Sequence, residues 1–199
     1  MLKYLIDGPN AITACGLVIT IVSLFLAITG HQTESIALLM WAVMLDHIDG
    51  WLARQMKTRR REYSLVGGDM DSATDMISAA IVPSCIGISL TNGSTLSLIS
   101  ALIISLAACL RVGYFNNFGL MDNGRFYGVP LTYTVPMVGL VFILSRVFPS
   151  NIRTHEVLPW LLIVMGALHV SPLKPPPVKG IGFLIVFCYS LFLSYFLLF

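Results

Sequence analysis

Charged side chains are scarce in this sequence. Only 11% of the 199 residues are Asp, Glu, Lys or Arg, whereas a soluble domain carries roughly a quarter. Hydrophobic residues make up 56% of the chain, and the mean hydropathy is +0.83. A formal net charge of only +2 offers no broad basic surface, so we expect no nucleic-acid partner. The composition excludes an ordinary soluble domain and predicts a chain that crosses a membrane several times.

Cysteine is rare as well, and its spacing excludes two kinds of site. The chain has four cysteines, and none of them forms a CxxC pair. We therefore expect neither a disulfide framework nor a zinc site, and interpret these residues as small buried apolar side chains within the hydrophobic segments. They are Cys15, Cys85, Cys109 and Cys188.

Long hydrophobic runs dominate the chain. Most reach the ~20 residues that a bilayer helix needs, although the sixth is short. We find no repeat and no soluble domain, so we expect one domain over residues 1–199: an all-α, polytopic membrane bundle of six or seven transmembrane helices. Pro83, Pro130 and Pro136 fall inside these runs and predict kinks. The runs are 9–29, 34–55, 69–90, 94–116, 128–148, 156–171 and 179–199.

The basic residues predict the orientation in the membrane. Four of them (Lys57, Arg59, Arg60 and Arg61) follow the second run in one loop, and the positive-inside rule assigns that loop to the cytoplasm. The N-terminus then lies on the same side. We expect an integral protein of the cell or inner membrane with its active site on the cytoplasmic side. The basic loop itself is expected to contact anionic lipid head groups.

Four aspartates gather at the predicted cytoplasmic ends of the second and third runs. Helical periodicity puts Asp46 and Asp49 on one face, and Asp71 and Asp75 on one face of the next helix. One loop joins the two helices, so we expect direct antiparallel contact. An aspartate at the bilayer centre costs about 2.5–3.5 kcal/mol, and four would approach ~10 kcal/mol without a counter-ion. A hard divalent cation, Mg²⁺ or Mn²⁺, suits carboxylate oxygens.

Less specific explanations of these positions stay open. The acids can form a salt-bridge cluster with Arg54 and the basic run 59–61, although one arginine facing four acids is a poor balance. Gly50, Ala53 and Gly67 leave space beside the acids, either for a ligand or for close helix packing.

The histidines are not assigned to the site. His47 lies about 100° round the helix from Asp46, so we expect it to contact a neighbouring helix or loop. His31, His155 and His169 lie in or near predicted loops and indicate no function.

The acidic pattern resembles the signature of the CDP-alcohol phosphotransferase family, enzymes of phospholipid synthesis. The resemblance covers eight positions in register, although the spacer between Arg54 and Gly67 has twelve residues and is longer than is usual in the family. The stretch "PNAIT" at 9–13 is similar to the family's opening motif. The eight positions are Asp46, Asp49, Gly50, Ala53, Arg54, Gly67, Asp71 and Asp75.

The resemblance implies a role for each position. The four aspartates would hold divalent metal against the pyrophosphate of a CDP-linked lipid, and Asp75 would also be the base for the acceptor hydroxyl. The family forms homodimers, so a homodimer is expected. A local role for Asn10 and Thr13, in a helix that starts near Pro9, stays open. The implied nucleotide site comprises Asn10, Thr13, Gly50, Ala53, Arg54, Ser64 and Gly67.

Later motifs resemble those of phosphatidylserine synthases. They are "LRVGYFN" (110–116), "RFYGVP" (125–130) and "HVSPLKPPP" (169–177). Arg111 can hold the carboxylate of serine, although it can also be a snorkelling cation at a helix end. Tyr114 stands where the subfamily often has a second arginine. The implied acceptor site comprises Arg111, Tyr114 and Asn116.

We therefore expect an enzyme that transfers phosphatidyl from CDP-diacylglycerol to a small alcohol, with L-serine the leading acceptor. The products would be phosphatidylserine and CMP. Glycerol 3-phosphate, inositol phosphate and choline are alternative acceptors; the first two want a denser basic pocket and choline wants aromatic faces. Alternatives of other kinds are an aspartate-rich membrane prenyltransferase, whose motifs lack the interposed glycine, alanine and arginine, and a divalent-cation transporter, which favours acids near mid-membrane.

Overall fold

The computed structural model describes residues 1–177 and 181–198, and this part of the chain contains helices and no strand. The all-α fold predicted from the sequence is confirmed. Short 3-10 helices at Leu2–Ile6 and Leu131–Tyr133 precede α1 and α6. The helices are α1 (Gly8–Ile28), α2 (Gln32–Gln55), α3 (Arg61–Met76), α4 (Val82–Leu90), α5 (Thr95–Phe118), α6 (Thr134–Val147), α7 (Thr154–His169) and α8 (Ile181–Leu198).

The protein is an integral membrane protein by the length and composition of its helices. Gly8–Ile28, Gln32–Gln55, Arg61–Leu90 and Thr95–Phe118 are each long and apolar enough to cross a bilayer. Leu131–Val147 and Leu184–Leu198 are shorter apolar helices. The seven helical segments correspond one to one to the seven predicted runs; residues 179, 180 and 199 of the last run lie outside the described part.

The third run begins earlier than predicted. We expected it to start near residue 69, but the helix already begins at Arg61 and continues to Leu90. Its first turns contain Arg61, Glu62 and Ser64, which a hydropathy pattern assigns to a loop although they are compatible with a helix. The loop after α2 therefore shrinks to residues 56–60.

A π-helical segment, Ile77–Ile81, interrupts this long helix two residues after Asp75. Pro83 follows it and has no N–H to donate to the carbonyl of Ala79, so the regular hydrogen-bond ladder cannot continue unchanged there. The predictions for the other two prolines are wrong. Pro130 lies just before the 3-10 helix Leu131–Tyr133, and Pro136 lies in the first turn of α6, where a proline is tolerated.

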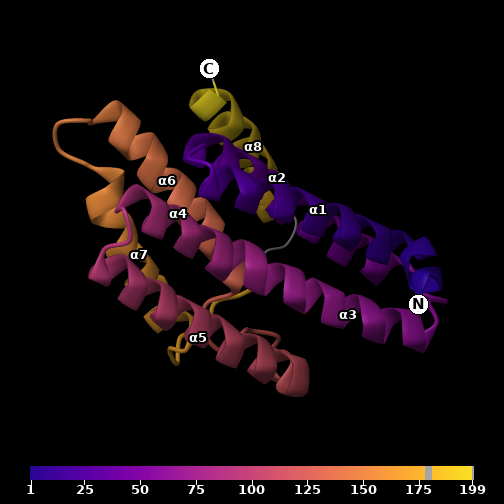
Figure 1. Cartoon of the computed structure of the whole chain (residues 1–199). Coiled ribbons are helices and arrows are strands. Elements are labelled where there is room, and N and C mark those ends of the chain that lie inside the picture. Colours follow the sequence, from indigo (N-terminus) through magenta and orange to yellow (C-terminus); the bar gives the residue numbers. More distant parts are fainter. Residues whose placement is uncertain (178–180, 199) are drawn as a thin grey trace.

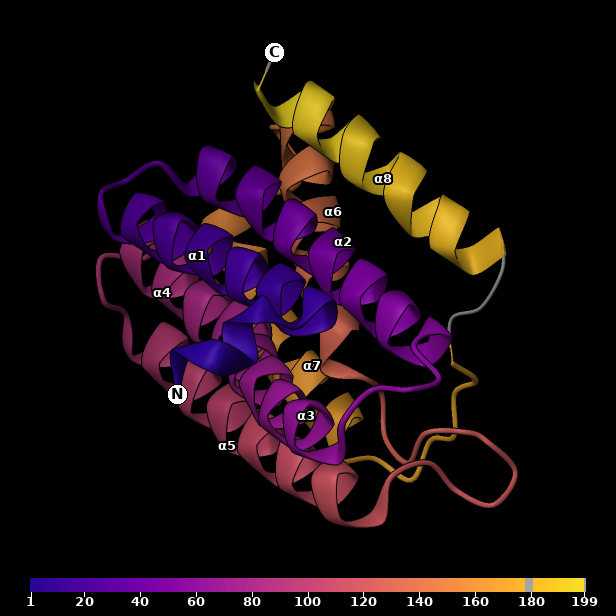
Figure 2. The same cartoon turned by 90° about the vertical axis from the view of Figure 1, so that its right-hand side faces the viewer.

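The long helix α3–α4 lies between two groups of helices. Figure 1 shows the α1–α2 pair on one side of it and α5 on the other. Helix α4 packs against α1 on one side and against α5 on the other. Helix α8 lies at the edge of the bundle, against α2 and α6 (Figure 2). The shared core contains fully buried side chains from most of these helices, including Ile36, Leu39, Met40, Val82, Ile86, Ile104, Val135, Leu158 and Leu193. The expected burial of the cysteines is wrong for Cys15, Cys109 and Cys188, which are exposed on the outside of the bundle.

The two aspartate helices do not pack closely against each other. The backbone of α3 lies close to α1 and α5, whereas its contact with α2 is marginal. The predicted contact of α2 with α3 is therefore made by the aspartate side chains and not by closely packed backbones. Helix α1 packs against both helices.

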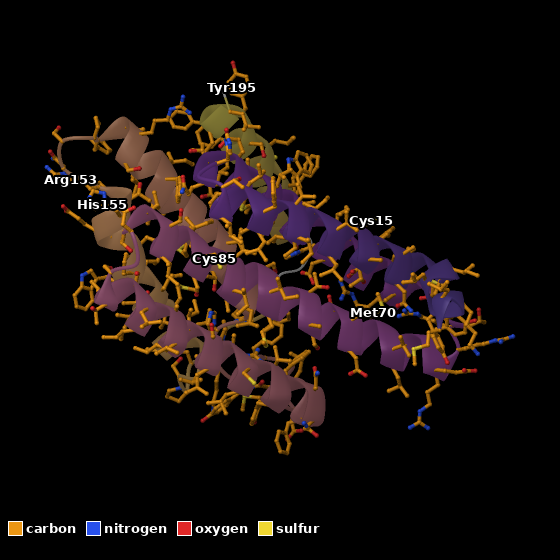
Figure 3. All side chains as sticks on the ribbon, in the orientation of Figure 1. Cys15, Met70, Cys85, Arg153, His155 and Tyr195 are labelled. Carbon is orange, nitrogen blue, oxygen red and sulfur yellow. The ribbon has the colours of Figure 1, made fainter. Side chains whose placement is uncertain are left out.

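The labelled side chains in Figure 3 identify the two ends of the bundle. Figure 3 shows Cys15 on α1 and Met70 on α3 in the half of the molecule that contains the N-terminus, whereas Arg153 and His155 lie at the opposite end. Met70 directly precedes Asp71, so the aspartates belong to the N-terminal half.

Candidate active site

Three of the four predicted metal ligands converge. Asp46 and Asp49 on α2 and Asp71 on α3 each offer a carboxylate oxygen, and these oxygens all lie within 4.8 Å of one another. Asp49 is buried, and the other two are half-buried. Three carboxylates this close repel each other unless a cation lies between them, and a donor set made only of oxygen fits Mg²⁺ or Mn²⁺.

No arginine or lysine side chain among the described residues neutralises these three aspartates, since no ion pair joins one to them. Arg54 is exposed and its guanidinium lies over Gly50, where an added Cβ would be 3.4 Å from Nη1. The salt-bridge explanation of the acidic cluster therefore finds no support in the geometry.

Thr13 orients the most buried aspartate. Its hydroxyl contacts a carboxylate oxygen of Asp49 and lies 3.1 Å from the carbonyl of Pro9. Thr13 itself is buried at the α1–α2 contact. A hydroxyl that donates to a metal-ligating carboxylate limits the carboxylate's rotation, so the contact supports a role beside the metal site.

His47 contacts the site, contrary to the sequence-based prediction. Its Nδ1 lies 2.8 Å from the carbonyl of Val43 and 3.2 Å from a carboxylate oxygen of Asp46. The helical angle of about 100° between neighbours does not exclude this contact, because the imidazole folds back along the helix toward the preceding turn. The adjacency of His47 to Asp46 was the available signal.

Asp75 lies apart from the three converging aspartates. It is one helical turn after Asp71 on the same face of α3, and it does not belong to the group within 4.8 Å. Its carboxylate is within electrostatic reach of Asp46, Asp71 and the guanidinium of Arg111. Asp75 therefore has both the acidic cluster and a buried cation in its electrostatic surroundings.

Asn10 and Gly67, two of the predicted nucleotide-site residues, contact each other. The Asn10 amide donates to the carbonyls of Tyr4 (3.0 Å) and Tyr63 (3.1 Å). A Cβ at Gly67 would overlap the Asn10 side-chain oxygen. The glycine therefore allows α3 to approach α1, as the close-packing explanation proposes. Ser64, another predicted nucleotide-site residue, lies one turn earlier on α3 and is exposed. Ala53 is half-buried near the end of α2.

Arg111 is buried, with only 6% of its surface exposed. Its guanidinium lies over the rings of Phe115 and Phe126, 5.4 and 5.5 Å from their centroids. Its Nε has no hydrogen-bond partner within the described part of the chain. A buried guanidinium with an unpaired donor is costly, so this side chain is suited to an anionic ligand.

The later motifs meet around Arg111. The backbone N–H groups of Phe126 and Gly128 donate to the carbonyls of Pro175 (3.1 Å) and Leu173 (2.8 Å). Gly128 has φ +78°, and a Cβ there would overlap the carbonyl of His169, which only glycine avoids. The motifs "RFYGVP" and "HVSPLKPPP" thus form two paired segments beside the end of α5.

His169 joins these two segments, and it is the last residue of α7, next to the loop in which it was expected. It is buried, its Nδ1 lies 2.9 Å from the carbonyl of Val129, and its Nε2 lies 2.9 Å from the hydroxyl of Thr134. The signal for it in the sequence was its place at the start of the "HVSPLKPPP" motif.

The remaining acceptor-site candidates lie near the C-terminal end of α5. The Tyr114 ring lies 5.4 Å from that of Tyr127 and 4.9 Å from that of Phe118, centroid to centroid. The Asn116 side-chain oxygen accepts a hydrogen bond of 3.0 Å from Ser72, the residue after Asp71. Both candidates are exposed, unlike Arg111.

Comparison with known proteins places this site in a family. A profile of the CDP-alcohol phosphatidyltransferase family matches residues 7–170, which include all four aspartates and Arg111. The CDP-diacylglycerol–serine O-phosphatidyltransferase of Methanocaldococcus jannaschii is 28% identical over 178 residues, 88% of this chain and 80% of the relative.

Two further relatives are similar over most of the chain. The archaetidylserine synthase of Methanothermobacter thermautotrophicus is 28% identical over 162 residues, 80% of this chain and 65% of the relative. The CDP-diacylglycerol–serine O-phosphatidyltransferase of Helicobacter pylori is 26% identical over 178 residues, 87% of this chain and 73% of the relative. Since the family profile spans most of its length, the chain belongs to the CDP-alcohol phosphatidyltransferase family.

Proposed function

We propose that this enzyme transfers the phosphatidyl group of CDP-diacylglycerol to the hydroxyl of L-serine and releases CMP. Family membership supports transfer from a CDP-activated alcohol, and the names of the three relatives support serine. The observation that carries the choice of acceptor is the buried Arg111, whose Nε is unpaired among the described residues and which lies within electrostatic reach of Asp75.

The aspartate cluster is proposed as the pyrophosphate end of the site. Asp46, Asp49 and Asp71 would hold Mg²⁺ or Mn²⁺, and Asp75 would complete the set from the next turn. The ion, when bound, would supply positive charge to offset the charge that develops on the pyrophosphate. Arg54 and Ser64 are exposed at the same end and are proposed to contact the CDP group.

The acceptor would approach from the opposite side of Asp75. Arg111 is suited to a carboxylate because a guanidinium forms two parallel hydrogen bonds with it. Serine held in this way would present its hydroxyl toward Asp75, which takes the proton. The serine oxygen then forms a bond to the phosphatidyl phosphorus, the bond from that phosphorus to the bridging oxygen breaks, and CMP leaves with the electron pair.

Two alternative acceptor classes fit this pocket less well. A choline cation would find aromatic rings beside Arg111, but the guanidinium would repel it. A phosphorylated acceptor would need more positive charge than one buried arginine offers. Membership of the family also sets aside the prenyltransferase and transporter alternatives.

The remaining predictions concern the whole protein. We propose that the chain forms one domain and that the site faces the cytoplasm. The lipid tails would enter from the bilayer between α2 and α3, where the backbones make little contact. The homodimer expected from the family resemblance stays a prediction, and chemical cross-linking in native membranes tests it.

CMP release by purified protein tests the proposed function. CDP-diacylglycerol and Mn²⁺ or Mg²⁺ would be supplied with serine, glycerol 3-phosphate, inositol phosphate or choline in separate reactions. We expect release with serine alone, and none from Asp75→Asn. A second CDP-linked donor, with archaetidyl tails, tests whether the enzyme also accepts the kind of lipid named for the archaeal relative. Release with another acceptor and none with serine would overturn the proposal.

Arg111 variants test the acceptor site. We expect Arg111→Met to raise the KM for serine roughly 10- to 100-fold, the loss expected for a charge-assisted hydrogen bond. The KM for CDP-diacylglycerol should stay near the wild-type value, because the pyrophosphate end of the site is intact. An equal rise in both KM values would argue against a serine carboxylate at Arg111.

A further inference from the structure

Arg59 turns inward from the basic loop instead of facing lipid head groups. Its side chain is only 11% exposed, and that of its partner Asp7 is 8% exposed. Both Nε (2.9 Å) and Nη2 (2.6 Å) of Arg59 donate to one carboxylate oxygen of Asp7. The expectation that the whole run 57–61 contacts lipid is therefore wrong for Arg59, whereas Lys57, Arg60 and Arg61 are exposed.

The same guanidinium holds Asn10. Its Nη2 donates to the Asn10 side-chain oxygen at 2.6 Å, and the Asn10 amide donates onward to the carbonyls of Tyr4 and Tyr63. A Cβ at Gly67 would lie 2.9 Å from Nη2 of Arg59. Arg59 and Asn10 thus cover the backbone of α3 one turn before Asp71.

Helix α1 connects this cluster to the other aspartate helix. Asn10 and Thr13 are three residues apart on α1 and therefore lie on one face. Asn10 contacts the start of α3 through Tyr63, and Thr13 contacts Asp49 on α2. Since the backbones of α2 and α3 make little contact with each other, the packing of both on α1 fixes their relative position.

We propose that Arg59 is a positioning residue that fixes α3 against α1 and so places Asp71 opposite Asp46 and Asp49. The loop that carries Arg59 belongs to the spacer of twelve residues between Arg54 and Gly67, and Arg59 is the side chain that fixes this loop to α1. Removing Arg59 leaves Asp7 and the Asn10 oxygen without their buried partner, and α3 shifts along α1.

Mn²⁺ binding without substrate tests this role directly. The proteins compared in detergent would be wild type, Arg59→Gln, Arg59→Lys and, as the matched control, Arg60→Gln, which changes an exposed neighbour. Free Mn²⁺ would be measured by electron paramagnetic resonance. We expect Arg59→Gln to weaken Mn²⁺ binding roughly 10- to 100-fold, as supporting contacts of metal ligands do, and Arg60→Gln to match wild type.

Kinetics and thermal unfolding separate positioning from general stability. Arg59→Lys keeps the charge but loses the double hydrogen bond, so we expect an intermediate loss of Mn²⁺ affinity. The half-saturating Mn²⁺ concentration for CMP release should rise in parallel, with an unchanged KM for serine. A lower melting temperature with wild-type Mn²⁺ affinity would overturn the proposal, as would an equal loss in Arg60→Gln.

The inference rests on the proposed metal site but not on serine as acceptor. Wild-type protein that binds no Mn²⁺ would contradict both the metal site and the inference. Tight Mn²⁺ binding that weakens in Arg59→Gln, together with no transfer to serine, would support the inference and overturn only the proposed acceptor.

Discussion

Thr13 and Asp49 show how a small polar side chain can order a ligand of the proposed metal site. Both residues are buried, and the threonine hydroxyl contacts the carboxylate that lies deepest of the three. A carboxylate in that position would otherwise choose among several rotamers before it binds a cation. The hydroxyl therefore reduces the cost of ordering the ligand.

Thr13→Val tests this contact, because valine has nearly the volume of threonine but no hydroxyl. We expect Thr13→Val to weaken Mn²⁺ binding roughly tenfold, because supporting contacts of metal ligands contribute about 10–100-fold. Thr13→Ser keeps the hydroxyl and should stay within a factor of about three of wild type. Isothermal titration of the purified protein measures both, and equal affinities for the valine and serine variants would contradict the prediction.

Asp71 and Asp69 offer a matched pair of acids on α3. Asp71 belongs to the converging cluster, whereas Asp69 is exposed and outside it. We expect Asp71→Asn to lower kcat for CMP release by at least about a hundredfold, since electrostatic stabilisation of the reacting group is lost. Asp69→Asn should keep activity near wild type. A comparable loss in that variant would show that the negative charge of α3 as a whole, and not the position of Asp71, supports catalysis.

Helix α3 depends on its glycines in different ways. Gly67 faces α1, where an added Cβ would overlap the Asn10 side chain, whereas nothing lies within 4 Å of a Cβ at Gly68. Two adjacent glycines in one helix therefore differ in packing although their helix propensities are equal.

The two alanine variants separate packing from propensity. Gly67→Ala should destabilise the protein by about 1–3 kcal/mol, as overpacking does, and lower Mn²⁺ affinity because α3 is displaced. Gly68→Ala should be neutral or stabilise by up to about 1 kcal/mol, since alanine favours the helix. Apparent melting temperatures in detergent compare them. A Gly67→Ala protein as stable as Gly68→Ala would show that α1 and α3 do not meet closely.

At the scale of the whole molecule, the two ends of the bundle should lie on opposite sides of the membrane. The loop at residues 56–60 lies near the N-terminal end, and Arg153 lies at the other (Figure 3). The positive-inside rule then assigns Lys57 to the cytoplasm and Asn151 to the other side.

Cysteine labelling in intact cells checks this orientation. In a background with alanine at the four native cysteines, Asn151→Cys should react with a membrane-impermeant maleimide and Lys57→Cys should not. Permeabilised cells should label both, which controls for exposure of the side chains. Labelling of Lys57→Cys alone in intact cells would reverse the proposed topology.

The sequence by itself determined the all-α membrane architecture, because runs of about 20 apolar residues have few alternatives to helices in a bilayer. It also indicated the acidic character of the candidate site, since four aspartates fall at helical spacing near the ends of two apolar runs. The tertiary structure alone decided that α1 packs against both aspartate helices, that Arg59 is buried against Asp7, and that His169 joins the segments around Arg111. Those contacts join residues distant in the chain, and helical periodicity within one segment cannot reveal them.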